Sequence, residues 1–154
     1  MESLAIQPAP DFVVTAPALA ARQTAEALGY VANPEPALSD SAFGAWRGRT
    51  LLDLQTSAPE ALMNWIQEPA SGTPGGEPFA CVIQRVSAWM SRQAQFDVRI
   101  LAVTHPNVMR AALAYGLDVP ASAAFRIDVA PLTMLTLSFN RQWRLQGLGV
   151  GASF

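Results

Sequence analysis

Residues 100–110, with the sequence ILAVTHPNVMR, predict the strand-to-helix turn on which the fold depends. The apolar and β-branched run 100–104 indicates a buried strand, and Pro106 suits the first position of a helix. His105 then lies at the carboxyl end of a strand and beside a helix N-terminus. Open α/β sheets bind ligands, often anions, at such positions. Because His105 is the only histidine in the chain, it is the first residue to suspect in an active site.

Composition limits the classes of function. The chain has 154 residues, of which 51% are hydrophobic and 14% are charged, which predicts one domain over residues 1–154. The net charge of −2 gives no bulk attraction for nucleic acid. No run approaches the ~18 apolar residues of a membrane helix, and the N-terminus shows no signal peptide. We therefore expect a cytoplasmic protein without nucleic-acid or membrane partners.

The periodicity of apolar residues predicts alternating strands and helices on both sides of residues 100–110. The expected strands are 12–15, 100–104, 125–129, 132–139 and 143–148, and the expected helices are 18–28, 50–55, 59–67, 79–95 and 106–115. A hairpin connection is expected at 140–142. This order predicts an α/β fold with three layers, α/β/α, around a mostly parallel sheet.

One helix has a clear apolar face. Phe79, Val82, Val86 and Met90 recur at helical spacing in the segment 79–95, which predicts that this face is buried. Cys81 is the only cysteine. A single cysteine forms no disulfide within the chain, and we expect it to be a small core side chain.

Three segments are expected to converge on one site. Thr15 and His105 both end strands, and the carboxyl ends of parallel strands meet at one edge of the sheet. Glu77 precedes the long helix, and Arg110 follows His105 by about one turn. A histidine, an acid and helix N-termini form a pocket for an oxyanion or phosphate. Each residue also has a structural interpretation: a hydrogen-bonded histidine, or a glutamate that favours the helix dipole.

Four segments in order resemble the histidine phosphatase superfamily, also called phosphoglycerate-mutase-like. Residues 13–28, VVTAPALAARQTAEAL, are similar to the family's strand and helix with Ser-Pro-Leu-x-Arg and Gln-Thr-Ala-Glu. Residues 43–48, FGAWRG, resemble its Phe-Gly-x-Trp-Glu-Gly loop. Residues 75–77, GGE, resemble the Gly-Gly-Glu-Ser loop, which carries a proton-donating acid. Residues 103–110, VTHPNVMR, resemble the segment with the second active-site histidine. The resemblance implies a phosphoglycerate-mutase-like fold.

The chain also departs from the family pattern. The resemblance implies a nucleophilic histidine in an Arg-His-Gly motif on a first strand before Phe12, and this motif is absent from the sequence. Ala20 stands where the family has its phosphate-binding arginine. Arg22 lies two positions on, about 200° around a helix, so it is no simple substitute. Arg47 replaces the loop glutamate, and Pro106 replaces a glycine.

These departures predict a degenerate member of the family without ordinary phosphatase or mutase activity. We expect a remnant site with His105 and Glu77 as catalytic positions and with Thr15, Arg22, Pro106 and Arg110 as anion contacts. No cofactor or metal is expected, and the ligand is phosphate or a small phosphorylated molecule. Two alternatives stay open: an active phosphomonoesterase completed by an upstream segment or by a repurposed His105, and a structural or interaction module.

The absent first strand has a structural consequence. In the family this strand lies inside the sheet, so its loss exposes backbone groups of the neighbouring strands. We therefore expect that the sheet rearranges, that a second copy covers the gap as a homodimer, or that the native protein begins upstream of Met1.

Overall fold

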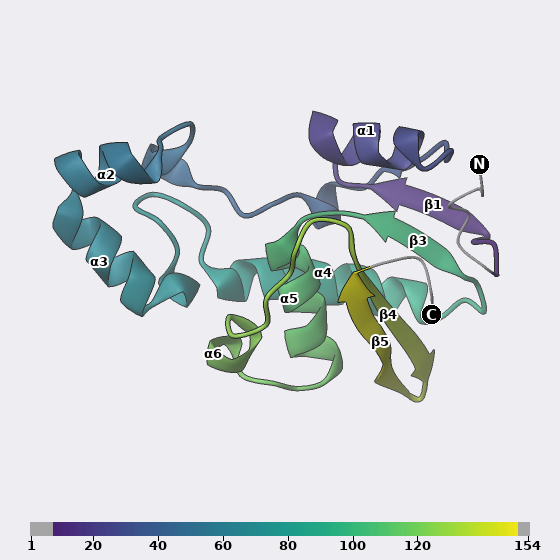
Figure 1. Ribbon diagram of the computed structural model, residues 1–154. Coiled ribbons are helices and arrows are strands. Elements are labelled where there is room, and N and C mark those ends of the chain that lie inside the picture. Colours follow the sequence, from purple (N-terminus) through teal and green to yellow (C-terminus); the bar gives the residue numbers. More distant parts are fainter. Residues whose placement is uncertain (1–7, 151–154) are drawn as a thin grey trace.

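In the computed structural model, which describes residues 8–150, three parallel strands form the central sheet (Figure 1). The strands are β1 (Phe12–Thr15), β2 (Asn33–Pro34) and β3 (Ile100–Val103), in the order β2-β1-β3. β1 and β3 pair from Phe12 opposite Ile100 to Thr15 opposite Val103. The two strands therefore end at the same edge of the sheet, as the sequence predicts.

Helices cover both faces of this sheet. Helix α1 (Leu19–Ala27) connects β1 to β2, whereas α4 (Phe79–Gln93) precedes β3 and α5 (Pro106–Gly116) follows it. Right-handed crossovers in opposite directions along a parallel sheet place their helices on opposite faces. Figure 1 shows this arrangement, with α1 on one side of the sheet and α4 and α5 on the other. The three-layer α/β/α prediction is confirmed.

The main core lies where α4 and α5 pack on each other and on the sheet. The predicted apolar face of α4 is buried, since Phe79, Val82, Val86 and Met90 are all at most 4% exposed. Val108 and Ala111 of α5 belong to the same cluster. The sequence prediction for this face is therefore confirmed.

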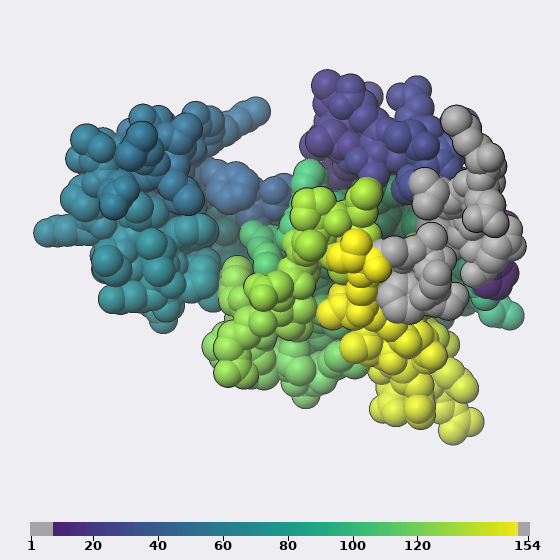
Figure 2. Space-filling model, viewed as in Figure 1, coloured from purple at the N-terminus to yellow at the C-terminus, as the bar shows by residue number. Residues whose placement is uncertain are grey.

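A helical lobe, here residues 44–71, projects from this body. It comprises η2 (Gly44–Trp46), α2 (Leu51–Ser57), α3 (Pro59–Gln67) and η3 (Pro69–Ser71). Thr50 begins α2 with a capping box that it forms with Asp53. The lobe has its own small apolar cluster, centred on Trp46, Leu54 and Leu62. Figure 2 shows it as a separate mass beside the rest of the molecule.

The last third of the chain completes the body with a short helix and a hairpin. Helix α6 (Ala121–Ala124) follows α5, and β4 (Thr133–Asn140) pairs antiparallel with β5 (Gln142–Val150). Arg141, at φ 66°, makes the expected turn. The short helix η1 (Pro36–Leu38) lies between β2 and the lobe. None of the helices among residues 8–150 is long and apolar enough to span a bilayer.

Three sequence predictions are wrong. Residues 125–129 form no strand, because Phe125, Arg126 and Ile127 continue the hydrogen bonding of α6 as turns. Cys81 is exposed, since it lies about 200° around α4 from Phe79 and so faces away from the core. The Asn-Pro-Glu-Pro sequence of residues 33–36 predicts a loop, but Asn33 and Pro34 form β2.

Candidate functional site

The structure places His105 at the turn between β3 and α5. It is the N-cap residue of α5, and its side chain is 19% exposed. The backbone carbonyl of His105 accepts hydrogen bonds from the amides of Val108 and Met109. His105 therefore stands at the N-terminal end of α5, where the helix dipole attracts negative charge.

Among the described residues, Asp40 is the acidic residue that contacts this histidine. The Asp40 Oδ2 atom lies 3.8 Å from His105 Nδ1, which makes an ion pair when the imidazole is protonated. The other carboxylate oxygen accepts a hydrogen bond of 2.8 Å from the amide of Ser41. The sequence interpretation missed Asp40; the available signal was its place just before the aromatic loop that begins at Phe43.

The second ring nitrogen of His105 lacks a partner. Its Nε2 atom is buried and has no hydrogen bond to any other described residue. Buried polar atoms are nearly always paired, and an unpaired one costs about 1–3 kcal/mol. The unpaired Nε2 atom makes His105 the candidate ligand-binding residue at the carboxyl edge of the sheet.

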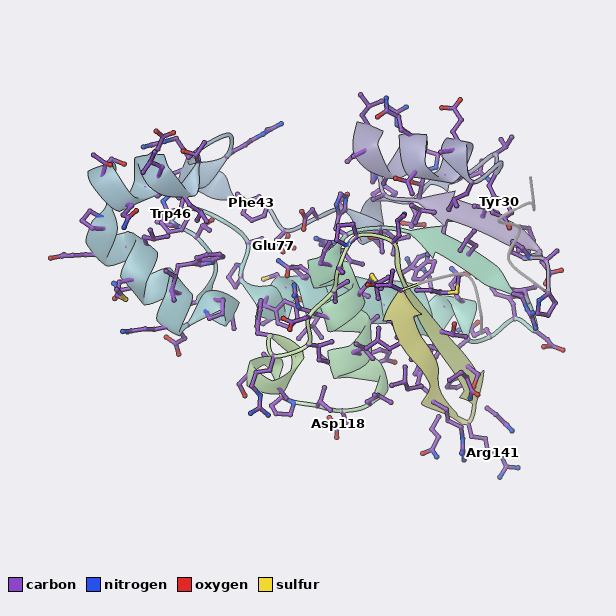
Figure 3. All side chains as sticks on the ribbon, in the orientation of Figure 1. Tyr30, Phe43, Trp46, Glu77, Asp118 and Arg141 are labelled. Atoms are coloured by element: carbon purple, nitrogen blue, oxygen red, sulfur yellow. The ribbon has the colours of Figure 1, made fainter. Side chains whose placement is uncertain are left out.

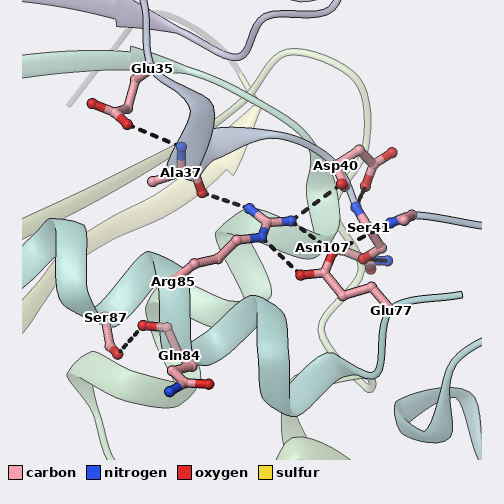
Figure 4. A network of polar contacts seen from close by, with 10 residues as sticks. Glu35, Ala37, Asp40, Ser41, Glu77, Gln84, Arg85, Ser87 and Asn107 are labelled. Atoms are coloured by element: carbon pink, nitrogen blue, oxygen red, sulfur yellow. Dashed lines mark hydrogen bonds and ion pairs between the residues drawn. The ribbon is translucent and has the colours of Figure 1, made fainter.

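Glu77 is paired with an arginine rather than with His105. Arg85 of α4 donates from Nε to Glu77 Oε1 at 2.9 Å and from Nη2 to Oε2 at 3.1 Å (Figure 4). The hydrogen bond from Arg85 and its charge lower the pKa of Glu77 against the opposing effect of partial burial, and the amide of Ala42 also contributes to the lowering. Glu77 is thus an anion at neutral pH, which does not favour the expected role of proton donor.

A chain of polar contacts links the expected anion contact Arg110 to the loop of Asp40. Arg110 donates from Nη1 to Asn107 Oδ1 at 3.0 Å and from Nε to the Ile127 carbonyl at 3.0 Å. Asn107 in turn donates to Ser41 Oγ at 3.3 Å. Arg110 is therefore linked to the loop of Asp40 through Asn107. Its Nε and Nη1 atoms already donate hydrogen bonds within the protein.

The other expected anion contacts have different surroundings. Thr15 is fully buried, and its hydroxyl donates to the carbonyl of Ala16 at 3.0 Å. Pro106 begins α5 and is exposed. Arg22 is exposed on α1, and none of the described contacts joins it to His105. Of the expected residues, Pro106 adjoins His105 in the chain, and none of the described contacts joins the side chain of Thr15, Arg22, Glu77 or Arg110 to that of His105.

A small cavity lies beside this group, between the helical lobe and the body. Its volume is about 30 Å³, which is room for about two water molecules. Five of its lining residues carry aromatic or acidic side chains: Phe43, Trp65, Glu77, Phe79 and Phe125. Ser41 and Asn107 also line it, so it adjoins the loop of Asp40. Figure 3 shows Phe43 and Glu77 where the lobe joins the body.

Comparisons with known proteins agree with this architecture. The model of the histidine phosphatase superfamily (branch 1) matches residues 3–150. A relative in Mycobacterium tuberculosis, described as a bifunctional protein, is 30% identical over 101 residues, which are 63% of this chain and 28% of that protein. The chain thus matches just over a quarter of the length of that relative.

Solved structures show the same fold. The α-ribazole phosphatase from Shigella flexneri is similar at a TM-score of 0.80 and 23% identity, over 96% of this chain and 79% of that one. A mycobacterial glucosyl-3-phosphoglycerate phosphatase, solved with VO3, is similar at a TM-score of 0.79 and 21% identity, over 92% of this chain and 77% of that one. The predicted fold class is confirmed.

Proposed function

This chain belongs to the histidine phosphatase superfamily, and from that membership we propose that its His105 site binds phosphate or a small phosphorylated ligand without ordinary phosphatase turnover. The observation that carries the proposal is the buried, unpaired Nε2 of His105. His105 caps the N-terminus of α5, whose dipole favours an anion. The phosphatases named in the comparisons agree with a phosphate ligand.

The residues of this chain argue against efficient turnover. The resemblance assigns the reaction to two histidines, of which the first takes the phosphoryl group, and these 154 residues contain one. Loss of a nucleophile from such a unit costs several orders of magnitude in rate. Ala20 supplies no guanidinium to clamp the phosphate, and Arg85 holds Glu77 as a carboxylate. Binding without efficient turnover is the function that these residues support best.

Phosphate binding can be followed through the only histidine. We expect inorganic phosphate to move the His105 Hε1 resonance in a saturable NMR titration. His105→Ala removes a charge-assisted contact of about 1.5–3 kcal/mol, so calorimetry should show affinity weaker by about 10-fold or more. Arg92→Gln, which changes an exposed arginine on α4 outside the expected site, is the control. Equal phosphate affinity in wild type and His105→Ala contradicts the proposal.

An active phosphomonoesterase is the second candidate, and the presence of His105 in the family's second-histidine segment favours it. In that case His105 is itself the nucleophile, or a segment upstream of the given sequence completes the site. Phosphate release from an aryl phosphate separates the two candidates. Activity in the wild type that disappears in both His105→Ala and Glu77→Ala establishes turnover and overturns binding alone.

A homodimer is proposed as the assembly, because β3 has an open edge. Within the described residues β3 pairs only with β1, and the β4–β5 hairpin forms a separate sheet. An open strand edge is a template for pairing with another chain. If a second copy covers this edge, the chain also fits the third candidate function, that of a structural or interaction module.

A further inference from the structure

Arg85 occupies a central position in the contacts around the site. Besides its two bonds to Glu77, it donates from Nη1 to the carbonyl of Ala37 at 2.6 Å and from Nη2 to the carbonyl of Asp40 at 3.2 Å. Its side chain is 25% exposed. Figure 4 shows the guanidinium between Glu77 on one side and the segment 37–40 on the other.

The segment that carries Asp40 is held through its carbonyl groups. Arg85 binds the carbonyls of Ala37 and Asp40, and Thr104 donates from Oγ1 to the carbonyl of Leu38 at 2.7 Å. These contacts come from α4 and from the end of β3, so they fix the segment to the two elements that flank the site. The position of the Asp40 carboxylate, 3.8 Å from His105 Nδ1, depends on them.

The geometry requires an arginine. The planar guanidinium offers five N–H donors in fixed directions, and here it reaches a carboxylate and two carbonyls at once. A lysine at this position keeps the positive charge, but it has one nitrogen and three donors. It cannot match the acceptors on both sides of the fork.

We infer that Arg85 is a positioning residue for the His105 site: its contacts with the carbonyls of Ala37 and Asp40 set the Asp40 carboxylate against the imidazole. Glu77 holds the guanidinium for this task. Glu77 and Arg85 thus act on the site indirectly, through the position of Asp40. None of the described contacts joins either side chain to His105. Its effect on ligand binding rests on the proposed function, whereas its effect on the Asp40–His105 contact does not.

The single histidine allows a double-substitution test of the contact itself. Asp40→Asn removes a charge beside the ring, so it should move the His105 Hε1 resonance at a fixed pH near 7. In an Arg85→Lys background the carboxylate is already displaced, and the effect of Asp40→Asn should fall by about half or more. In an Arg92→Gln background, where an exposed arginine of the same helix changes, the full effect should persist.

Two results overturn the inference. One is an equal effect of Asp40→Asn on His105 in the wild type and in Arg85→Lys, and the other is no effect in the wild type. Arg85→Gln serves as a second variant, and an excluded osmolyte such as trimethylamine N-oxide keeps a weakened variant folded for the measurement. Because unfolding alone would also remove the effect of Asp40→Asn, the comparison counts only under conditions in which circular dichroism shows each variant to be folded.

A phosphate titration separates this inference from the proposed function. If Arg85 positions the site, Arg85→Lys should weaken phosphate binding several-fold, and Arg92→Gln should leave it unchanged. Unchanged phosphate affinity in Arg85→Lys counts against the inference. If the wild type binds no phosphate, the proposed function fails, and the comparison of His105 resonances still decides the role of Arg85.

Discussion

At the scale of single residues, the site depends on which acid meets the histidine. The sequence directs attention to Glu77, because it stands in a glycine loop before a long helix. The structure pairs Glu77 with Arg85 and places Asp40 beside His105. Asp40 and His105 are far apart in the chain, so no local pattern reports their contact.

The lowered pKa of Glu77 predicts a pH-dependent contribution to stability. A carboxylate whose pKa is depressed in the folded state stabilises the protein above its unfolded value, here near 4.5, and the contribution is lost as the pH falls through the folded pKa. Glu77→Gln should therefore lower the free energy of unfolding by about 1–2 kcal/mol at pH 7. Urea denaturation should show this difference shrinking below about pH 4.

The matched control for this experiment is Glu26→Gln, which changes an exposed carboxylate on α1. It should have little effect at either pH. A Glu77→Gln difference that stays constant from neutral to acidic pH contradicts the assignment of an ionised, paired Glu77.

At the scale of elements, two glycine-bearing loops join the helical lobe to the body. The Ala45 amide donates to the Pro74 carbonyl at 2.9 Å, and the Glu77 amide donates to the Ala42 carbonyl at 2.8 Å. A Cβ on Gly44 would lie 2.4 Å from the carbonyl carbon of Gly75. The two loops thus pack backbone against backbone, which only a residue without a side chain permits at this position.

Gly44→Ala should destabilise the protein by more than conformational strain alone. Gly44 and Gly48 both have positive φ, 54° and 74°, but a Cβ at Gly48 meets nothing within 4 Å. Gly48→Ala should cost about 1–2 kcal/mol, and Gly44→Ala should cost at least about 1–2 kcal/mol more, because backbone must move. Equal midpoints for the two variants in urea denaturation would show that the loops do not pack as described.

The helical lobe should open more readily than the body. Its cluster has three buried residues, whereas the main core has eleven, so fewer apolar contacts oppose local unfolding. In native-state hydrogen exchange, the amides of α2 and α3 should exchange faster than those of α4 and α5. Equal protection in both regions would contradict this difference.

At the scale of the whole molecule, β3 has one edge without a partner strand among residues 8–150. The amides of Phe12 and Ala16 donate to the carbonyls of Arg99 and Val103, so the odd-numbered residues of β3 direct their backbone groups toward β1. Backbone groups of successive residues in a strand point to opposite edges. Ile100 and Ala102 therefore direct theirs to the open edge.

This alternation provides an internal control for the proposed homodimer. Size-exclusion chromatography with light scattering should give twice the monomer mass of 16.5 kDa. The amides of Leu101 and Val103 are protected from hydrogen exchange by pairing with β1. In the dimer, the amides of Ile100 and Ala102 should be protected as well, by pairing with the second copy. A well-folded monomer, with rapid exchange at Ile100 and Ala102 alone, would refute the dimer.

Much of the fold is predictable from local patterns. The apolar face of α4, the β3–α5 turn and the hairpin around Arg141 follow from periodicity and turn chemistry, and the structure confirms them. The strand expected at 125–129 is wrong. A short run with apolar residues is compatible with a buried turn as well as with a strand, and the pattern alone does not separate the two. Phe125 there packs against Phe79, with ring centroids 4.7 Å apart.

The sequence by itself determines the elements and the place of His105 at a strand end, because neighbours along the chain control periodicity, caps and turns. Only the tertiary structure decides which distant groups meet. It pairs Asp40 with His105 and Glu77 with Arg85, and it leaves Nε2 of His105 unpaired among the described residues. The physical reason is that the contact of Asp40 with His105 joins segments far apart in the chain, whose relative positions depend on the packing of α4 and α5 against the sheet.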